Sequence, residues 1–178
     1  MKFLFDIRLL LIGLWLGAAV FFVGVAQSAF AVLPTRELAG MVVNRTLLIL
    51  NVSGIIIGVL LFAGSLIGNG AGKRVLLWLE RVLLVLIVAA CAVGQFVLGF
   101  WLQLTRAQMG KPVDEVAVDD PLRIQFNNLH NYSEWVLMAA MVAALIAFFV
   151  MANRRAVTAA SKGTTTDPFD FSKEFKKS

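Results

Sequence analysis

Four runs of apolar residues, each long enough to cross a lipid bilayer, constrain this chain more than any other feature of its sequence. They lie at residues 9–33, 47–67, 75–104 and 132–152. A spanning helix needs about 20 apolar residues, because the hydrocarbon core is about 30 Å thick. Backbone polar groups in that core must be paired within the segment, so each run is predicted to be a helix. The sequence therefore predicts an all-α membrane protein, an up-down bundle of four transmembrane helices.

The composition excludes a water-soluble fold. Hydrophobic residues make up 60% of the 178 residues and charged residues 15%, whereas soluble domains have about 45–50% and about 25%. A β-barrel is excluded because the runs do not alternate between apolar and polar residues. We expect one transmembrane domain over residues 1–152. A basic tail follows over 153–178, and it is either flexible or docked on the lipid surface or a partner.

The ends of the first and last spans need separate arguments. Ala29-Phe30-Ala31 resembles the cleavage site of a secretory signal. However, the apolar run Leu9–Leu33 has 25 residues, longer than the about 7–15 residues of a signal, so an uncleaved span is predicted. In the fourth span, Asp120 followed by Pro121 is typical of an N-cap and the first helical position. The fourth helix is therefore predicted over 122–152, beginning before the membrane.

The basic residues indicate an orientation. With four spans, both termini lie on the same side, and cytoplasmic segments carry an excess of Lys and Arg. The side of the termini has eleven basic residues and the opposite side five, so both termini are predicted to be cytoplasmic. The five are Arg36, Arg45, Arg106, Lys111 and Arg123.

Polar residues at a similar depth in all four spans suggest a cluster in the outer leaflet. The fourth helix carries a polar stripe on one face, made of Arg123, Asn127, His130 and Glu134. The other three spans contribute Gln27, Asn51 and Gln95. Polar groups are expensive in lipid, so these side chains are expected to converge inside the bundle. The cluster would be either a small-ligand or ion site or hydrogen-bonded contacts that hold the helices together.

Small residues repeat along one face of each of the first two spans. Small residues at such spacing let helix backbones approach closely. We therefore expect the first two helices to pack through these faces, with homodimerisation as the alternative. The residues are Gly13, Gly17 and Gly24 on the first span, and Gly54 and Gly58 on the second.

The chain has few residues of the types that bind metals or cofactors. The chain has one cysteine, Cys91, and one histidine, His130, so no intrachain disulfide and no bis-histidine haem can form. No metal or cofactor is expected. The sequence has no catalytic-serine, zinc-protease or phosphate-loop motif and no basic patch with interleaved aromatics. We therefore expect a protein that is not an enzyme and does not bind nucleic acid.

Three strings carry a family resemblance: Leu33–Gly40, Arg106-x-x-Met109-Gly110 and Phe126-x-x-Leu129-His130-x-x-Ser133. They resemble the transmembrane-protein-two-hundred-and-five-like family, small bacterial membrane proteins of unknown function. Over residues 8–152 the resemblance implies four helices but no activity, substrate or cofactor. We expect a non-catalytic structural or accessory component of the bacterial inner membrane, alone or in a larger complex. The alternative is binding or transport of a small molecule or ion through the polar cluster.

The orientation is tested by reporter fusions after Leu66, Met109 and Ser178. We expect the first and third reporters in the cytoplasm and the second outside, because of the excess of basic residues on the side of the termini. A C-terminal reporter that is translocated across the membrane would contradict the topology.

Overall fold

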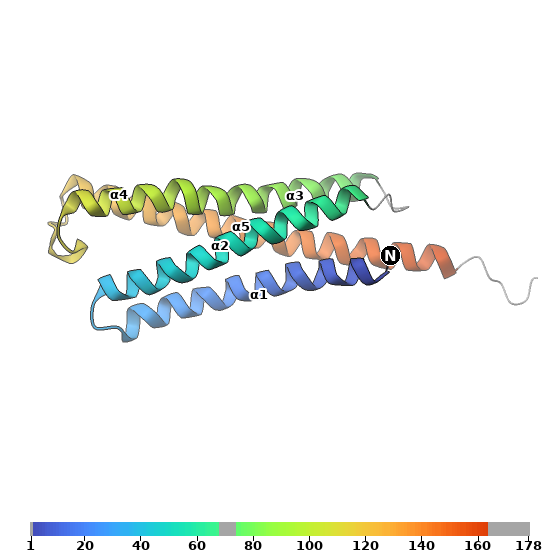
Figure 1. Ribbon diagram of the computed structural model, residues 1–178, viewed down its shortest axis with the longest axis horizontal. Coiled ribbons are helices and arrows are strands. Elements are labelled where there is room, and N and C mark those ends of the chain that lie inside the picture. Colours follow the sequence, from blue (N-terminus) through green and yellow to red (C-terminus); the bar gives the residue numbers. More distant parts are fainter. Residues whose placement is uncertain (1, 68–73, 164–178) are drawn as a thin grey trace, which may run out of the picture.

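Four spans form the bundle in the computed structural model, which describes residues 2–67 and 74–163 (Figure 1). All regular structure in these ranges is helical, and four stretches are long and apolar enough to cross a membrane, as predicted. The third span is continuous over Arg74–Met109 but contains a π-helical segment. The elements are α1 (Lys2–Val32), α2 (Arg36–Ile67), α3 (Arg74–Ala92), the π-helix η1 (Val93–Leu98), α4 (Gly99–Met109), the 3-10 turn η2 (Val113–Glu115) and α5 (Pro121–Gly163).

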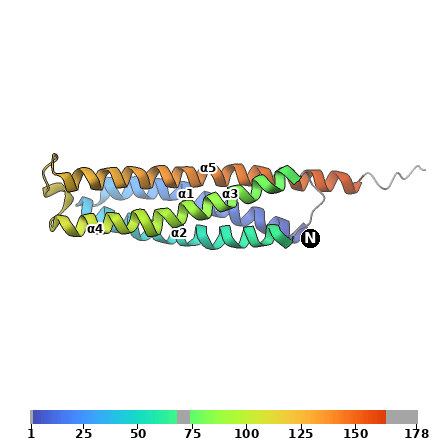
Figure 2. The same cartoon turned by 90° about the horizontal axis from the view of Figure 1, so that it is seen from above.

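The spans run up and down. The start of α1 and the far end of α5 lie at one end of the bundle, here called the termini end (Figure 1). The opposite end, here called the loop end, carries the connections α1–α2 and α4–α5. Figure 2 shows α5 extending beside α3 and α4 along the length of the molecule. An even number of spans thus places both ends of the bundle's chain on the same side, while the cytoplasmic location of that side stays a prediction.

Charged residues mark the limits of the membrane-spanning part. Between Glu134 and Arg154, α5 has nineteen residues without a charge. At about 1.5 Å per residue these cover about 28 Å, close to the thickness of the hydrocarbon core. Exposed aromatic side chains lie near both limits, Trp135 toward the loop end and Trp78 toward the termini end. Tryptophan favours the membrane–water interface, which supports these limits.

The boundaries of α5 agree with the sequence at one end and differ at the other. α5 begins at Pro121, and the Asp120 carboxylate accepts a hydrogen bond of 2.8 Å from the Leu122 N–H, so the predicted N-cap is confirmed. The helix continues past Ala152 to Gly163, so the predicted tail begins as helix. Residues 68–73, between α2 and α3, and the last part of the tail, 164–178, lie outside the described residues.

Small residues let the helices approach in the middle of the bundle. On α5, Ala140, Ala144 and Ala147 are buried at a spacing of three and four residues, where α5 packs on α3 and α1. On α2, a Cβ built on Gly58 would lie 2.5 Å from Cγ2 of Val88 on α3. Such separations exclude a side chain, so these contacts require small residues.

Gly54 lies where three helices meet. A Cβ built there would lie 2.7 Å from Sγ of Cys91 on α3 and 2.7 Å from Nε1 of Trp15 on α1. The Trp15 indole fills this space and donates a hydrogen bond of 3.1 Å to the Leu50 carbonyl of α2. The prediction that small residues of α2 allow close packing is therefore confirmed, but they face α3 as well as α1.

The glycines of the first span do not form the predicted seam, so that part of the prediction is wrong. Gly17 and Gly24 are exposed, and a Cβ on either would meet nothing within 4 Å. Gly13 faces Phe148 of α5 instead of α2. α1 contacts α2 through larger side chains such as Trp15, and their bulk turns the glycine face of α1 away.

Replacing Gly58 by Leu is expected to lower the free energy of unfolding in detergent by about 1–3 kcal/mol, because the new side chain overlaps Val88. Gly17→Leu is the matched control and should change stability by less than about 0.5 kcal/mol. Thermal or chemical unfolding of the purified variants measures both. Equal losses for the two variants would show that the close contact at Gly58 is unimportant.

Candidate functional site

A buried carboxylate joins three helices near the termini end. Glu80 of α3 is fully buried, and arginines from two other helices donate to its two oxygens. Arg8 of α1 donates through Nη2 to Oε1, and Arg154 of α5 donates through Nη1 to Oε2. The same Nη2 of Arg8 also donates to the Leu61 carbonyl of α2 at 2.9 Å. We call Arg8, Glu80 and Arg154 the ion triad; it makes contacts with all four spans.

The ion triad satisfies charges that could not be buried separately. An isolated ionised group in a low-dielectric interior is very costly, whereas paired and hydrogen-bonded charges are tolerated. Both carboxylate oxygens of Glu80 are occupied by guanidinium groups, so the acid has charge-assisted bonds on each side. The triad can therefore hold the helices at fixed relative depths.

A fourth arginine stabilises the end of α2. Arg81 donates from Nη2 to the Ser65 carbonyl at 2.8 Å and from Nε to the Ser65 hydroxyl at 3.3 Å. The last carbonyls of a helix lack partners within the helix and carry partial negative charge. Arg81 therefore caps the C-terminus of α2 from the neighbouring helix.

The sequence patterns assigned no role to Glu80. One signal was available: Arg8, Glu80 and Arg154 each lie at the same end of an uncharged stretch. Because the spans alternate in direction, these three positions share a depth. That correspondence would have identified a possible ion cluster, although not its burial.

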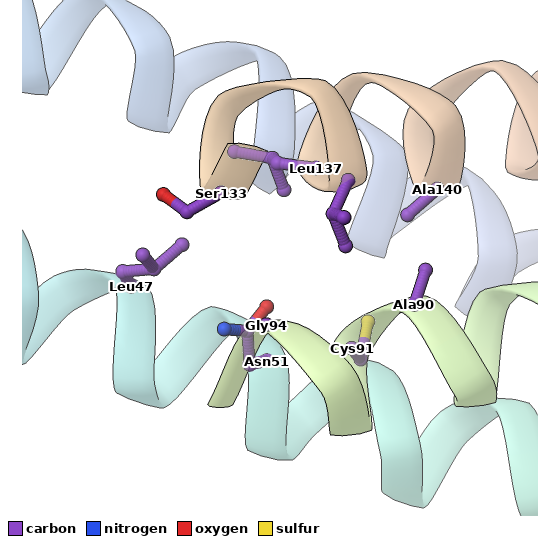
Figure 3. Close-up of a pocket in the computed structure, with 9 residues that line it drawn as sticks. Leu47, Asn51, Ala90, Cys91, Gly94, Ser133, Leu137 and Ala140 are labelled. Carbon is purple, nitrogen blue, oxygen red and sulfur yellow. The ribbon is translucent and has the colours of Figure 1, made fainter. Parts of the chain in front are cut away.

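A small hollow lies among α2, α3, η1 and α5 in the middle of the bundle (Figure 3). Its volume is about 10 Å³, enough for about one water molecule. The Asn51 side chain is only 4% exposed, and no hydrogen-bond partner for its amide occurs in residues 2–67 and 74–163. Figure 3 shows the Asn51 amide and the Ser133 hydroxyl at the edge of the hollow, with the Cys91 sulfur nearby.

The π-helix η1 forms one wall of this hollow. The Gly99 N–H donates to the Gly94 carbonyl, five residues earlier, in place of the usual spacing of four. A Cβ on Gly94 would lie 3.4 Å from Nδ2 of Asn51, an ordinary contact distance, so Gly94 lies directly against the amide. Single π-turns within α-helices are frequent at functional sites. The hollow combines a π-turn with an amide that lines it and has no hydrogen-bond partner in the described residues, which makes it a candidate binding position.

The predicted outer-leaflet cluster does not form around Glu134. The His130 and Glu134 side chains do lie together, with 3.3 Å between Nε2 and Oε1, but they are 43% and 65% exposed. The physical reason is depth: Glu134 lies at the limit of the uncharged part of α5, where its charge reaches the headgroup region. The Glu134 side chain is therefore stable without a partner inside the bundle.

The other members of the predicted cluster are also dispersed. Gln27 and Asn127 are exposed, Gln95 and Arg123 are half-buried, and only Asn51 is buried. Arg123 donates to the Val116 carbonyl of the loop before α5, so it holds the loop. The prediction that these side chains converge is wrong. A shared depth along the helices does not determine the direction in which a side chain points.

Comparison with known proteins gives one match. The sequence model of a family described as "Domain of unknown function (DUF4149)" matches residues 10–111, more than half of the chain. The matched region contains Glu80, Asn51 and η1 but ends before the Phe126-x-x-Leu129-His130-x-x-Ser133 string. No curated protein and no solved structure matches the chain.

Glu80→Gln is expected to lower the free energy of unfolding by about 3–5 kcal/mol, because it removes the buried negative charge that the guanidinium groups of Arg8 and Arg154 share. Glu134→Gln makes the same chemical change at an exposed site and should cost less than about 0.5 kcal/mol. Both are measured by unfolding in the same detergent. A Glu80→Gln protein as stable as Glu134→Gln would contradict the role of the ion triad.

Proposed function

Because the chain belongs to the DUF4149 family, a domain of unknown function, we propose a role from its own geometry. The protein is a non-catalytic integral membrane protein that acts as a structural or accessory component, alone or within a larger complex. One observation carries this proposal: both oxygens of Glu80, the buried acid of the bundle, are occupied by Arg8 and Arg154. An acid that binds a ligand or exchanges protons needs an accessible oxygen, whereas Glu80 is fully buried and does not line the hollow beside Asn51.

The outer surface supports a role through contact. Large apolar side chains are exposed on all four spans, for example Phe21 on α1, Ile56 on α2, Phe96 in η1 and Phe149 on α5. Such surfaces pack against lipid or against other transmembrane helices. We place the protein in the bacterial inner membrane, and we retain its resemblance to the transmembrane-protein-two-hundred-and-five-like family as part of the proposal.

A second function is favoured by a different observation, the Asn51 amide. The Asn51 amide lines the hollow, and a hydrogen-bonding ligand of about the size of water would pair with it there. This alternative replaces the outer-leaflet cluster by the hollow beside Gly94 and Ser133. The protein would then bind an ion or a polar molecule no larger than about one water.

Mass spectrometry of the intact protein from native membranes, in mild detergent, distinguishes the two functions. The accessory function within a larger complex predicts other protein subunits bound in fixed stoichiometry. Asn51→Leu should leave these subunits bound, because the hollow lies inside the bundle.

The ligand function predicts the opposite pattern. The wild-type protein would carry a bound ion or other ligand of about the size of water and no protein partner, and Asn51→Leu would lose this ligand because its apolar side chain replaces the amide. That result would overturn the accessory function.

A further inference from the structure

We propose that Arg74, Trp78 and Arg81 form a binding site for the phosphate group of an anionic phospholipid at the termini end of the bundle. The three residues lie on one face of α3, since positions separated by four and seven residues fall within about 60° around a helix. Arg74 is exposed, Trp78 is 66% exposed and Arg81 is half-buried. The face is therefore open to the surroundings of the bundle.

The hydrogen bonds of Arg81 leave much of its guanidinium group available. An arginine has five N–H donors, and Arg81 uses two of them on neutral acceptors of Ser65. In the described part of the chain it has no carboxylate partner, whereas Arg8 and Arg154 at the same depth share Glu80. A half-buried guanidinium without a counter-ion favours an external anion, and its planar fork suits phosphate.

The depth of the site matches the headgroup region. Arg81 is the last charged residue before a stretch of twenty-four uncharged residues that ends at Arg106. Arg74 lies seven residues nearer the termini end, about 10 Å along the helix. Trp78, between them, is a residue type that favours the interface. The two guanidinium groups therefore flank the level at which lipid phosphates lie.

The neighbouring surface favours a phospholipid over free phosphate. Val85 follows Arg81 by one turn on the same face of α3 and is 51% exposed. It continues the face from the charged residues into the uncharged stretch. A phospholipid bound through its phosphate would thus have an apolar surface along which its acyl chain could lie, which a free phosphate ion would not use.

The test titrates the full-length protein in mild detergent with phosphatidylglycerol or with phosphatidylcholine of the same chain length, and counts bound lipids by native mass spectrometry. We expect preferential binding of phosphatidylglycerol.

Arg74→Gln should weaken phosphatidylglycerol binding about fivefold, as one basic residue contributes on this scale. Arg81→Gln should weaken phosphatidylglycerol binding similarly. Because this variant also loses the hydrogen bonds that cap α2, it could affect folding. Arg74→Gln and Trp78→Leu leave that cap in place, so they test lipid binding independently of folding. Arg45→Gln, an exposed arginine nearer the loop end, is the matched control and should change binding by less than twofold.

Three results would overturn the proposal. Equal binding of phosphatidylcholine would show that anionic lipid is not selected. Equal weakening by Arg45→Gln and Arg74→Gln would show a general effect of net charge. Displacement of the lipid by an equal concentration of inorganic phosphate would assign the site to the free ion and not to a phospholipid.

Discussion

The pairing of one buried carboxylate with two arginines is the interaction on which the arrangement of the spans depends. Glu80 is bonded to residues 72 and 74 positions away in the sequence, on α1 and α5. In a low-dielectric interior such charges are tolerated only when paired closely, so a helix cannot slide along its axis without separating them. Arg8 also reaches the Leu61 carbonyl, which includes α2 in the same contact. The depths of the four spans are therefore linked at the termini end.

The remainder of the bundle uses other contacts. In the middle, where charges would be costly, small residues allow close approach: alanines on α5, and Gly54 and Gly58 on α2. Toward the loop end, ion pairs return in a more exposed setting, as between Arg106 of α4 and Glu37 of α2 at 2.6 Å. Ion pairs thus lie toward both ends of the bundle and small residues in its middle. This order follows the polarity of a membrane, which is polar at its two surfaces and apolar at its centre.

The use of charge differs between the interior and the surface. Inside, Glu80 has both oxygens occupied, which supports a structural purpose. On the surface of α3, Arg74 and Arg81 have no carboxylate partner in the described ranges and face the headgroup level, which supports recognition of lipid. The Asn51 amide is intermediate, because it is buried and lies beside a hollow of water size. Glu80 thus stabilises the bundle, whereas Asn51 and the two arginines of α3 are available to bind other molecules.

The sequence by itself determined the four spans and the start of α5, because hydrophobic length and an Asp-Pro cap act locally. The tertiary structure alone decided how each helix is rotated about its axis. Helical spacing shows that His130 and Glu134 share a face, but not that this face points outward. Glu80 turns inward because Arg8 and Arg154 come to it from distant parts of the chain. Gly17 and Gly24 face outward because bulkier residues of α1 occupy its contacts. Rotation depends on several neighbouring helices at once, and the pattern of a single helix carries no information about those neighbours.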